Sequence, residues 1–117
     1  MAGHVMRCGV VLPGGTATEQ LDQAVLAEQA GWDGVFVWEA AYGVDAWSLL
    51  AAIAVRTARV RLGTMLTPLP WRRPWKVASQ VATVDQLSGG RAIVAVGQAK
   101  LKSERMCFEL ITSYAPP

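Results

Sequence analysis

The sequence predicts an α/β fold built on a parallel sheet. Four short runs rich in β-branched residues are nearly all apolar in their middle, as strands buried on both faces are: Met6–Leu12, Gly34–Trp38, Val60–Met65 and Ala92–Gly97. A helical pattern separates each run from the next. The runs begin at intervals close to the roughly 30 residues of a right-handed βαβ unit. With 117 residues, the chain has room for one small domain.

The first helix is expected to follow Thr16. Thr16 and Glu19 have the spacing of a capping box, in which the hydroxyl and the carboxylate each accept a hydrogen bond from an otherwise unpaired backbone amide. One apolar face follows, and Gly31 ends the helix because glycine adopts the left-handed conformation without steric cost.

The second and third helices carry similar end signals. Asp45 is the expected N-cap of the second helix, which runs to about Thr57. Pro74 lies in the first turn of the third helix, where a missing amide costs nothing. The sequence Ser-Gly-Gly at residues 88–90 ends this helix.

Residues 98–117 differ in character from residues 1–97, and the chain is therefore divided at Gly97. Apolar residues recur at three- to four-residue spacing between Leu101 and Tyr114. We expect either one amphipathic helix or an irregular tail there, and the sequence favours neither.

Composition and charge exclude several classes of protein. Eleven basic and nine acidic residues give a net charge of +2 without a long basic run, so no nucleic-acid partner is expected. The longest apolar run, within Ala46–Val55, is far shorter than the roughly 20 residues that span a bilayer. No secretory signal is evident, and we expect a cytoplasmic protein. Cys8 and Cys107 lack the spacing of a metal or disulfide site and are expected to be free, largely buried thiols.

From Gly31 to Gly97 the sequence closely resembles the N-terminal part of the luciferase-like, flavin-dependent oxidoreductases. The segments that carry the resemblance are GWDGVFVWE, RVRLGTMLTPLPWRRPWKVA and VDQLSGGR, and MRCGVVLPGG fits the family's first strand. The family includes bacterial luciferase-type monooxygenases and dehydrogenases that use the deazaflavin coenzyme F-420. The resemblance implies a TIM-type (β/α)8 barrel, which takes about 250 residues. The chain is expected to supply four βα units, a truncated half barrel.

The ends of the third and fourth strands hold the candidate cofactor-binding residues. Ligands bind beyond the carboxyl ends of parallel strands. Gly63 allows the backbone to approach a flat ring, and Thr64 supplies a hydroxyl and an amide. The resemblance implies that both contact the cofactor, as does Gly97. A strand-end bulge at Gly63 and a plain turn at Gly97 are the structural alternatives.

Glu39 is the candidate catalytic residue. A carboxyl group at a strand end beside Trp38 is suited to act as acid or base. The family commonly has an aspartate and then a histidine where this chain has Glu39 and Ala40. The alternative is a loop carboxylate that caps an amide or pairs with an arginine. His4 precedes the first strand and receives no catalytic role.

A cluster of cations precedes the third helix. Arg72, Arg73 and Lys76 alternate with Trp71 and Trp75, a pattern that can attract phosphate. Three cations are few, and we favour a solvated helix start. The two tryptophans are candidates for an interface between subunits.

Two functions follow. The first is a luciferase-like monooxygenase or related oxidoreductase that uses FMN or F-420 on a small-molecule substrate, as a homodimer or larger oligomer. The alternative is a non-catalytic half barrel that self-associates or acts as a binding module. The half barrel lacks the later loops with which such barrels hold the cofactor phosphate. Its first and fourth strands are expected to form open sheet edges. A flavodoxin-like domain ranks last, because LPGGTATEQ is a poor phosphate-binding loop.

Overall fold

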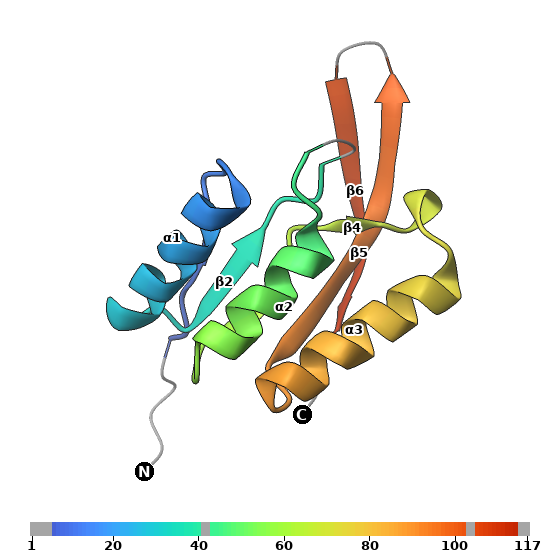
Figure 1. Ribbon diagram of the computed structural model, residues 1–117. Coiled ribbons are helices and arrows are strands. Elements are labelled where there is room, and N and C mark those ends of the chain that lie inside the picture. The colour runs from blue at the N-terminus through green and yellow to red at the C-terminus, as the bar shows by residue number, and fades with distance from the viewer. Residues whose placement is uncertain (1–5, 41–42, 103–104, 115–117) are drawn as a thin grey trace.

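The computed structural model describes residues 6–40, 43–102 and 105–114, and from residue 98 on it describes the backbone alone. Four parallel strands pair in chain order: β1 (Gly9–Val11), β2 (Gly34–Val37), β3 (Arg61–Thr64) and β5 (Ala92–Lys102). Three helices cover one face of this sheet (Figure 1): α1 (Ala17–Gln29), α2 (Ala46–Arg56) and α3 (Pro74–Ser88). The predicted α/β class and parallel order are confirmed.

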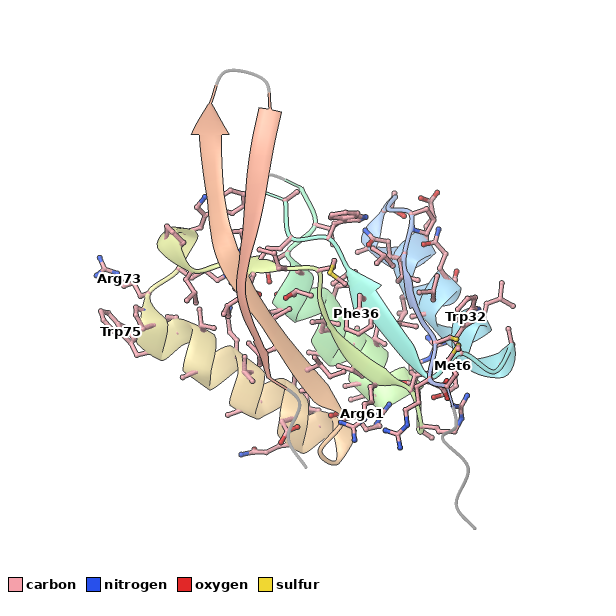
Figure 2. The ribbon with its side chains drawn as sticks, turned by 180° about the vertical axis from the view of Figure 1, so that it is seen from behind. Met6, Trp32, Phe36, Arg61, Arg73 and Trp75 are labelled. Atoms are coloured by element: carbon pink, nitrogen blue, oxygen red, sulfur yellow. The ribbon has the colours of Figure 1, made fainter. Side chains whose placement is uncertain are left out.

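The hydrophobic core lies between the sheet and the helices. Its members include fully buried side chains of β2, α2 and β3: Val35, Val37, Leu50, Ile53 and Leu62. Side chains alternate along a strand, so Phe36 faces the opposite side of the sheet. No helix of the described residues covers that side (Figure 2). We call it the open face.

The helix ends follow the predicted signals. Thr16 and Glu19 form the capping box of α1, and the side chain of Asp45 caps α2 by accepting a hydrogen bond from the backbone amide of residue 48. Pro74 opens α3, and Gly89 ends it in the left-handed conformation with a φ of 68°. No helix in the described parts of the chain is long and apolar enough to cross a membrane.

Two short elements between β3 and α3 were not predicted. They are the strand β4 (Thr67–Pro68) and the 3-10 helix η1 (Leu69–Trp71). β4 pairs in parallel with β5 farther along the sheet, at Val96 and Gly97. This segment, which begins with a cis peptide bond between Met65 and Leu66, carries the chain back across the carboxyl edge of the sheet.

The helix expected over Leu101–Tyr114 is wrong for the described residues. The backbone there forms the end of β5 and the strand β6 (Arg105–Tyr114), which runs antiparallel to β5. The prediction of a helix rests only on apolar residues that recur every three to four positions. Met106, Phe108 and Leu110 also recur at every second position, which is the period of a strand.

The edge of the fourth predicted strand is therefore not open. β6 pairs with β5 from Val94 to Lys102, across the predicted division of the chain at Gly97. The register shifts between Val96 and Gly97, so an irregularity lies at that division. The division itself stays a prediction.

Two charged side chains fasten the amino side of the sheet to the helices. Glu28 on α1 accepts hydrogen bonds from the amides of residues 58–60, at 2.8 to 3.1 Å. Burial acts to raise the pKa of Glu28, but these amides and the positive charge of Arg91 bring it below its ordinary value. Arg91 donates to four backbone carbonyls at 2.6 to 3.0 Å, those of Ala54, Thr57, Val60 and Ser88.

Replacing Glu28→Gln is expected to lower the free energy of unfolding by about 1 to 2 kcal/mol at pH 7, because hydrogen bonds to a charged acceptor are weakened. The folded-state pKa of Glu28 lies below the unfolded one. Its contribution is therefore present above the unfolded pKa and is lost as the pH falls through the folded pKa. Urea denaturation from pH 7 to 3 should show the gap between parent and variant closing.

The control is Asp22→Asn, on an exposed position of the same helix. It should change the free energy of unfolding by no more than about 0.5 kcal/mol. A gap for Glu28→Gln that is equally wide at both ends of the pH range would contradict the assigned role.

Candidate functional site

Three of the predicted site residues lie at the carboxyl ends of their strands, but Gly97 does not end its strand as predicted, because β5 continues to Lys102. Gly63 and Thr64 end β3, and Glu39 follows β2 by two residues. Gly97 is buried where β5 pairs with β4 on one side and β6 on the other. The four residues do not share one surface, because the side chains of Thr64 and Glu39 lie on the helix side whereas Gly63 lies on the open face.

Gly63 lies on the open face, since Leu62 and Thr64 on either side of it are buried toward the helices. A Cβ atom at this position would collide with the carbonyl oxygen of Ile93 on β5. The close approach of two strands is therefore sufficient reason for a glycine. Its contact with a cofactor stays a prediction.

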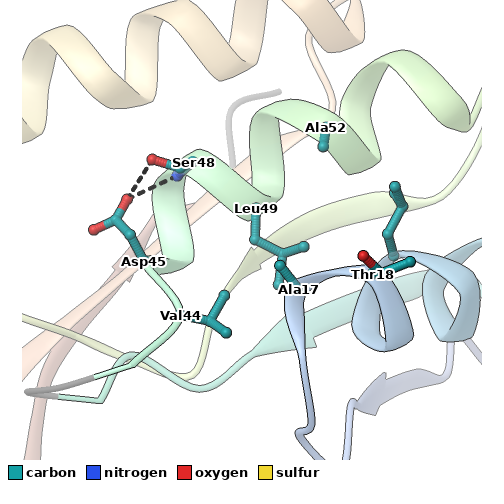
Figure 3. Close-up of a pocket in the computed structure, with 8 residues that line it drawn as sticks. Ala17, Thr18, Val44, Asp45, Ser48, Leu49 and Ala52 are labelled. Atoms are coloured by element: carbon teal, nitrogen blue, oxygen red, sulfur yellow. Dashed lines mark hydrogen bonds between the residues drawn. The ribbon is translucent and has the colours of Figure 1, made fainter.

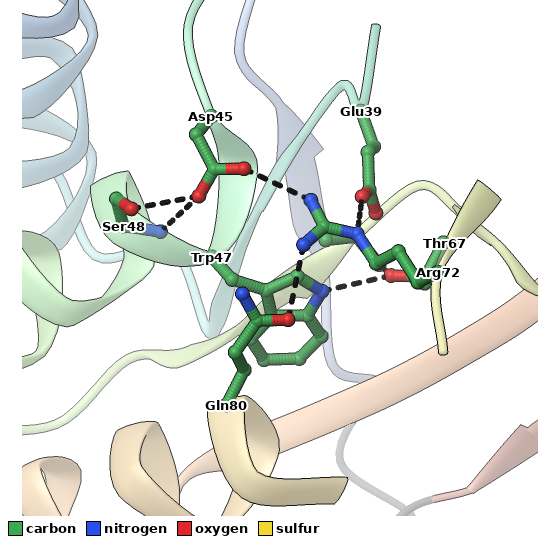
Figure 4. Close-up of polar contacts among 8 residues, drawn as sticks. Glu39, Asp45, Trp47, Ser48, Thr67, Arg72 and Gln80 are labelled. Carbon is green, nitrogen blue, oxygen red and sulfur yellow. Dashed lines mark hydrogen bonds and ion pairs between the residues drawn. The ribbon is translucent and has the colours of Figure 1, made fainter. Parts of the chain in front are cut away.

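The side chain of Thr64 points toward the helices and is 0% exposed. Its Oγ1 lies 2.8 Å from Oγ1 of Thr67, which also accepts a hydrogen bond from Nε1 of Trp47 at 3.0 Å (Figure 4). The predicted hydroxyl contact would require this buried cluster to open. A ligand on the open face can reach only the backbone of Thr64.

Glu39 is a buried carboxylate, 4% exposed. Its Oε1 accepts a hydrogen bond from Nε of Arg72 within an ion pair (Figure 4). Its Oε2 is buried without a hydrogen-bond partner among the described residues. Burial raises the pKa of Glu39 above its ordinary value, the charge of Asp45 adds to this, and the nearby Thr67 hydroxyl and Arg72 oppose it.

Arg72 was missed as a site residue. Besides Glu39, its guanidinium binds Oδ1 of Asp45 and Oε1 of Gln80, each at 3.0 Å, and its side chain is only 17% exposed. The predicted solvated helix start is thus wrong for Arg72. It describes Arg73, which is exposed and lies over the ring of Trp75 at 5.4 Å. Nothing in the sequence distinguishes the two adjacent arginines.

Two exposed apolar side chains also stand at this edge. Trp38 is 51% exposed and Met65 is 37% exposed. They directly follow the neighbouring strands β2 and β3, and the amide of Met65 donates to the carbonyl of Val37 at 2.9 Å. If the alternation of side chains is extended by one residue beyond each strand, both side chains fall on the open face. From the sequence, Trp38 is interpreted only as a neighbour of Glu39, although an aromatic residue at the end of a parallel strand itself indicates a candidate ligand contact.

Two further expectations concern residues away from this edge. Cys8 is free as expected, but it is exposed because it lies at the start of β1, outside the core. The side chain of Cys107 and all of His4 lie outside the described residues.

Two grooves of the helix layer are more voluminous than the one between α2 and α3, and neither includes a predicted site residue. One, of about 320 Å³ between α1 and α2, is apolar except at Thr18 and at the end where Asp45 binds Ser48 (Figure 3). The other, of about 540 Å³, lies between α3 and β5.

Comparison with known proteins identifies the family. The model of the luciferase-like monooxygenase family matches residues 4–108, and the chain belongs to this family. A relative, the 4-hydroxyprotoasukamycin monooxygenase of Streptomyces nodosus subsp. asukaensis, is 34% identical over 97 residues, covering 79% of this chain and 26% of the relative.

Two solved structures are similar in fold. The coenzyme F-420 dependent tetrahydromethanopterin reductase of Methanopyrus kandleri has a TM-score of 0.73 and 30% identity, with 78% of this chain and 26% of that chain covered. The oxygenating constituent of the Pseudomonas putida 3,6-diketocamphane monooxygenase, in complex with FMN, has a TM-score of 0.68 and 26% identity, with 80% and 29% covered. The chain thus spans about a quarter of the length of these proteins.

Replacing Gly63→Ala is expected to lower the free energy of unfolding by about 1 to 3 kcal/mol, the usual cost of overpacking, because the new methyl group meets the Ile93 backbone. Gly34→Ala is the matched control on β2. Its methyl group would meet the movable ring of Phe36 at 3.3 Å, so the loss should be smaller.

Urea denaturation of both variants measures the difference. Equal stability of the two variants would show that strand packing does not require Gly63, and the cofactor would become the better reason for this glycine.

Proposed function

We propose that this chain forms part of an oxidoreductase that binds FMN or F-420 and acts on a small organic substrate. The match of the luciferase-like monooxygenase family over residues 4–108 carries the proposal. Of the similar solved structures, one is named as F-420 dependent and another holds FMN. Either cofactor is compatible with this chain, and the proposal leaves the choice open.

The open face at the carboxyl edge fits the ring of such a cofactor. Trp38 and Met65 are exposed there on neighbouring strands, and Gly63 adds no side chain between them and β5. Ligand sites are usually lined by apolar and aromatic side chains with a few polar groups, and Trp38 and Met65 supply the apolar part here. We place the ring against these residues, with Gly97 and the Thr64 backbone as further contacts. The cofactor supplies hydride or oxygen chemistry, and the protein orients it and excludes water.

We expect the described residues to hold the ring of the cofactor and not its phosphate. TIM barrels frequently hold phosphate with the loops after the seventh and eighth strands, whereas we assign the four parallel strands of this chain to the first half of the barrel. At the described edge, Arg72 is already bonded to Glu39 and Asp45. Binding by this chain is therefore expected to depend on the ring.

Glu39 is the proposed acid–base group. Burial raises its pKa, so the carboxyl group takes up a proton at a higher pH than an exposed glutamate does. The unpartnered Oε2 is where that proton would be held. Because its side chain lies on the helix side, Glu39 holds the proton beside the edge and not against the ring.

Self-association, as a homodimer or larger oligomer, is part of the proposal. Trp75 and Leu87 on α3 are exposed, as are Trp38 and Met65 on the open face. Exposed apolar side chains of this kind favour association. The same surfaces would serve the alternative function, a non-catalytic binding module. A cytoplasmic location without nucleic-acid or membrane partners completes the proposal.

Titration of the purified chain with FMN or F-420 is expected to quench tryptophan fluorescence saturably. Riboflavin, which lacks the phosphate, should bind with an affinity similar to that of FMN, because Arg72 is already bonded to Glu39 and Asp45 and Arg73 lies over Trp75 on α3. Fluorescence corrected for ligand absorption, together with calorimetry, provides the measurement.

Two variants locate the site. Trp38→Phe should lose most of the quenching, whereas Trp75→Phe, which removes another exposed tryptophan, from α3, should keep it. Absence of saturable binding by either cofactor would leave the non-catalytic alternative. Equal loss of quenching in the two variants would place the ligand away from the open face.

A further inference from the structure

One guanidinium group connects three elements at the carboxyl edge. Arg72, between η1 and α3, donates to Glu39 after β2, to Asp45 at the start of α2, and to Gln80 on α3 (Figure 4). Glu39 and Asp45 lie at the two ends of the connection between β2 and α2. A single side chain thus holds both ends of that connection.

We propose that Arg72 is a positioning residue of the cofactor site: it fixes the connection between β2 and α2 and sets the orientation of the Glu39 carboxylate. The inference rests on the proposed function, because the same connection borders the open face beside Trp38. Arg72 is not placed in contact with the cofactor. It acts through the groups that it holds.

Arginine suits this role because its donors form a rigid planar fork. Nε, Nη1 and Nη2 each reach a different acceptor in a single orientation of the group. A lysine ammonium is a compact charge on a flexible stem, and it does not reproduce this geometry. The three acceptors come from separate elements, so the fork determines their relative positions.

The charges around the group make its loss consequential. Among the described residues, the charged groups that face Glu39 are Arg72 and Asp45, and the hydroxyl of Thr67 approaches from β4. Without Arg72, the buried carboxylate of Glu39 would face the exposed carboxylate of Asp45 without a cation between them. A carboxylate left unpaired in this way is strongly destabilising.

Asp45 is held from both sides. Its Oδ2 accepts hydrogen bonds from the amide and the hydroxyl of Ser48, at 2.9 and 2.7 Å. Its Oδ1 accepts a hydrogen bond from Arg72. Burial acts to raise the pKa of Asp45, but Ser48 and Arg72 together bring it below its ordinary value. Asp45 therefore links the helix cap to the Arg72 fork.

The test is a pH titration of the Glu39 and Asp45 carboxyl carbons by 13C NMR, in the full chain without cofactor. Arg72→Met should raise the pKa of both groups, because both lose a cation and a donor. Arg73→Met is the matched control, since the adjacent guanidinium lies over Trp75, and it should change neither pKa.

Two more variants separate geometry from charge. Arg72→Lys should return at most one of the two pKa values to that of the parent chain, because one ammonium group cannot donate to both carboxylates in the geometry of the guanidinium. Asp45→Asn should lower the pKa of Glu39, because the negative charge that raises it is gone. Asparagine caps helices as well as aspartate does, so this variant keeps the inference testable even if Arg72→Met does not fold.

An unchanged Glu39 pKa in folded Arg72→Met, full recovery of both pKa values in Arg72→Lys, or no response to Asp45→Asn would each overturn the inference. Cofactor titration supplies the functional readout, where Arg72→Met should bind more weakly than Arg73→Met. If the parent chain binds no cofactor, the proposed function fails, and the titrations without cofactor still decide whether Arg72 positions these groups.

Discussion

A carboxylate buried at the end of a strand requires a cation, and Arg72 is that cation for Glu39. Taking a carboxylate out of water costs several kcal/mol unless a partner compensates it. The partner lies far along the chain, after β4 and η1, so these short elements must run back across the carboxyl edge. In doing so they bring Thr67 beside Thr64 and under Trp47, and the edge closes over its own polar groups.

The two edges of the sheet are built from different kinds of contact. At the amino edge, Glu28 and Arg91 bind mainly backbone amides and carbonyls, and Arg91 also donates to the Thr57 hydroxyl. At the carboxyl edge, the contacts of Arg72 join side chain to side chain, and one oxygen of Glu39 has no partner among the described residues. Parallel α/β barrels separate stability and chemistry between their two ends in the same way.

Local signals in the sequence predicted the helices and the order of the strands, because capping and strand burial depend on neighbouring residues. The Thr16 capping box is an example. Contacts between distant segments were not predictable in this way. Arg72 and Arg73 are chemically identical neighbours, and only the path of the chain decides which one is buried. Gly63 was predicted to lie at the carboxyl edge, but the approach of Ile93, a sufficient reason for the glycine, appears only in the folded sheet.

The pairing of β6 has a consequence for how a barrel can close. In a closed barrel of parallel strands, every strand has a neighbour on both edges. The second edge of β5 would then belong to a fifth parallel strand, but β6 holds that edge from Val94 to Lys102 in the opposite direction. A backbone amide cannot serve both partners. β6 and a fifth parallel strand would therefore compete for the same edge of β5. β6 must be displaced before the sheet can be extended by a parallel strand.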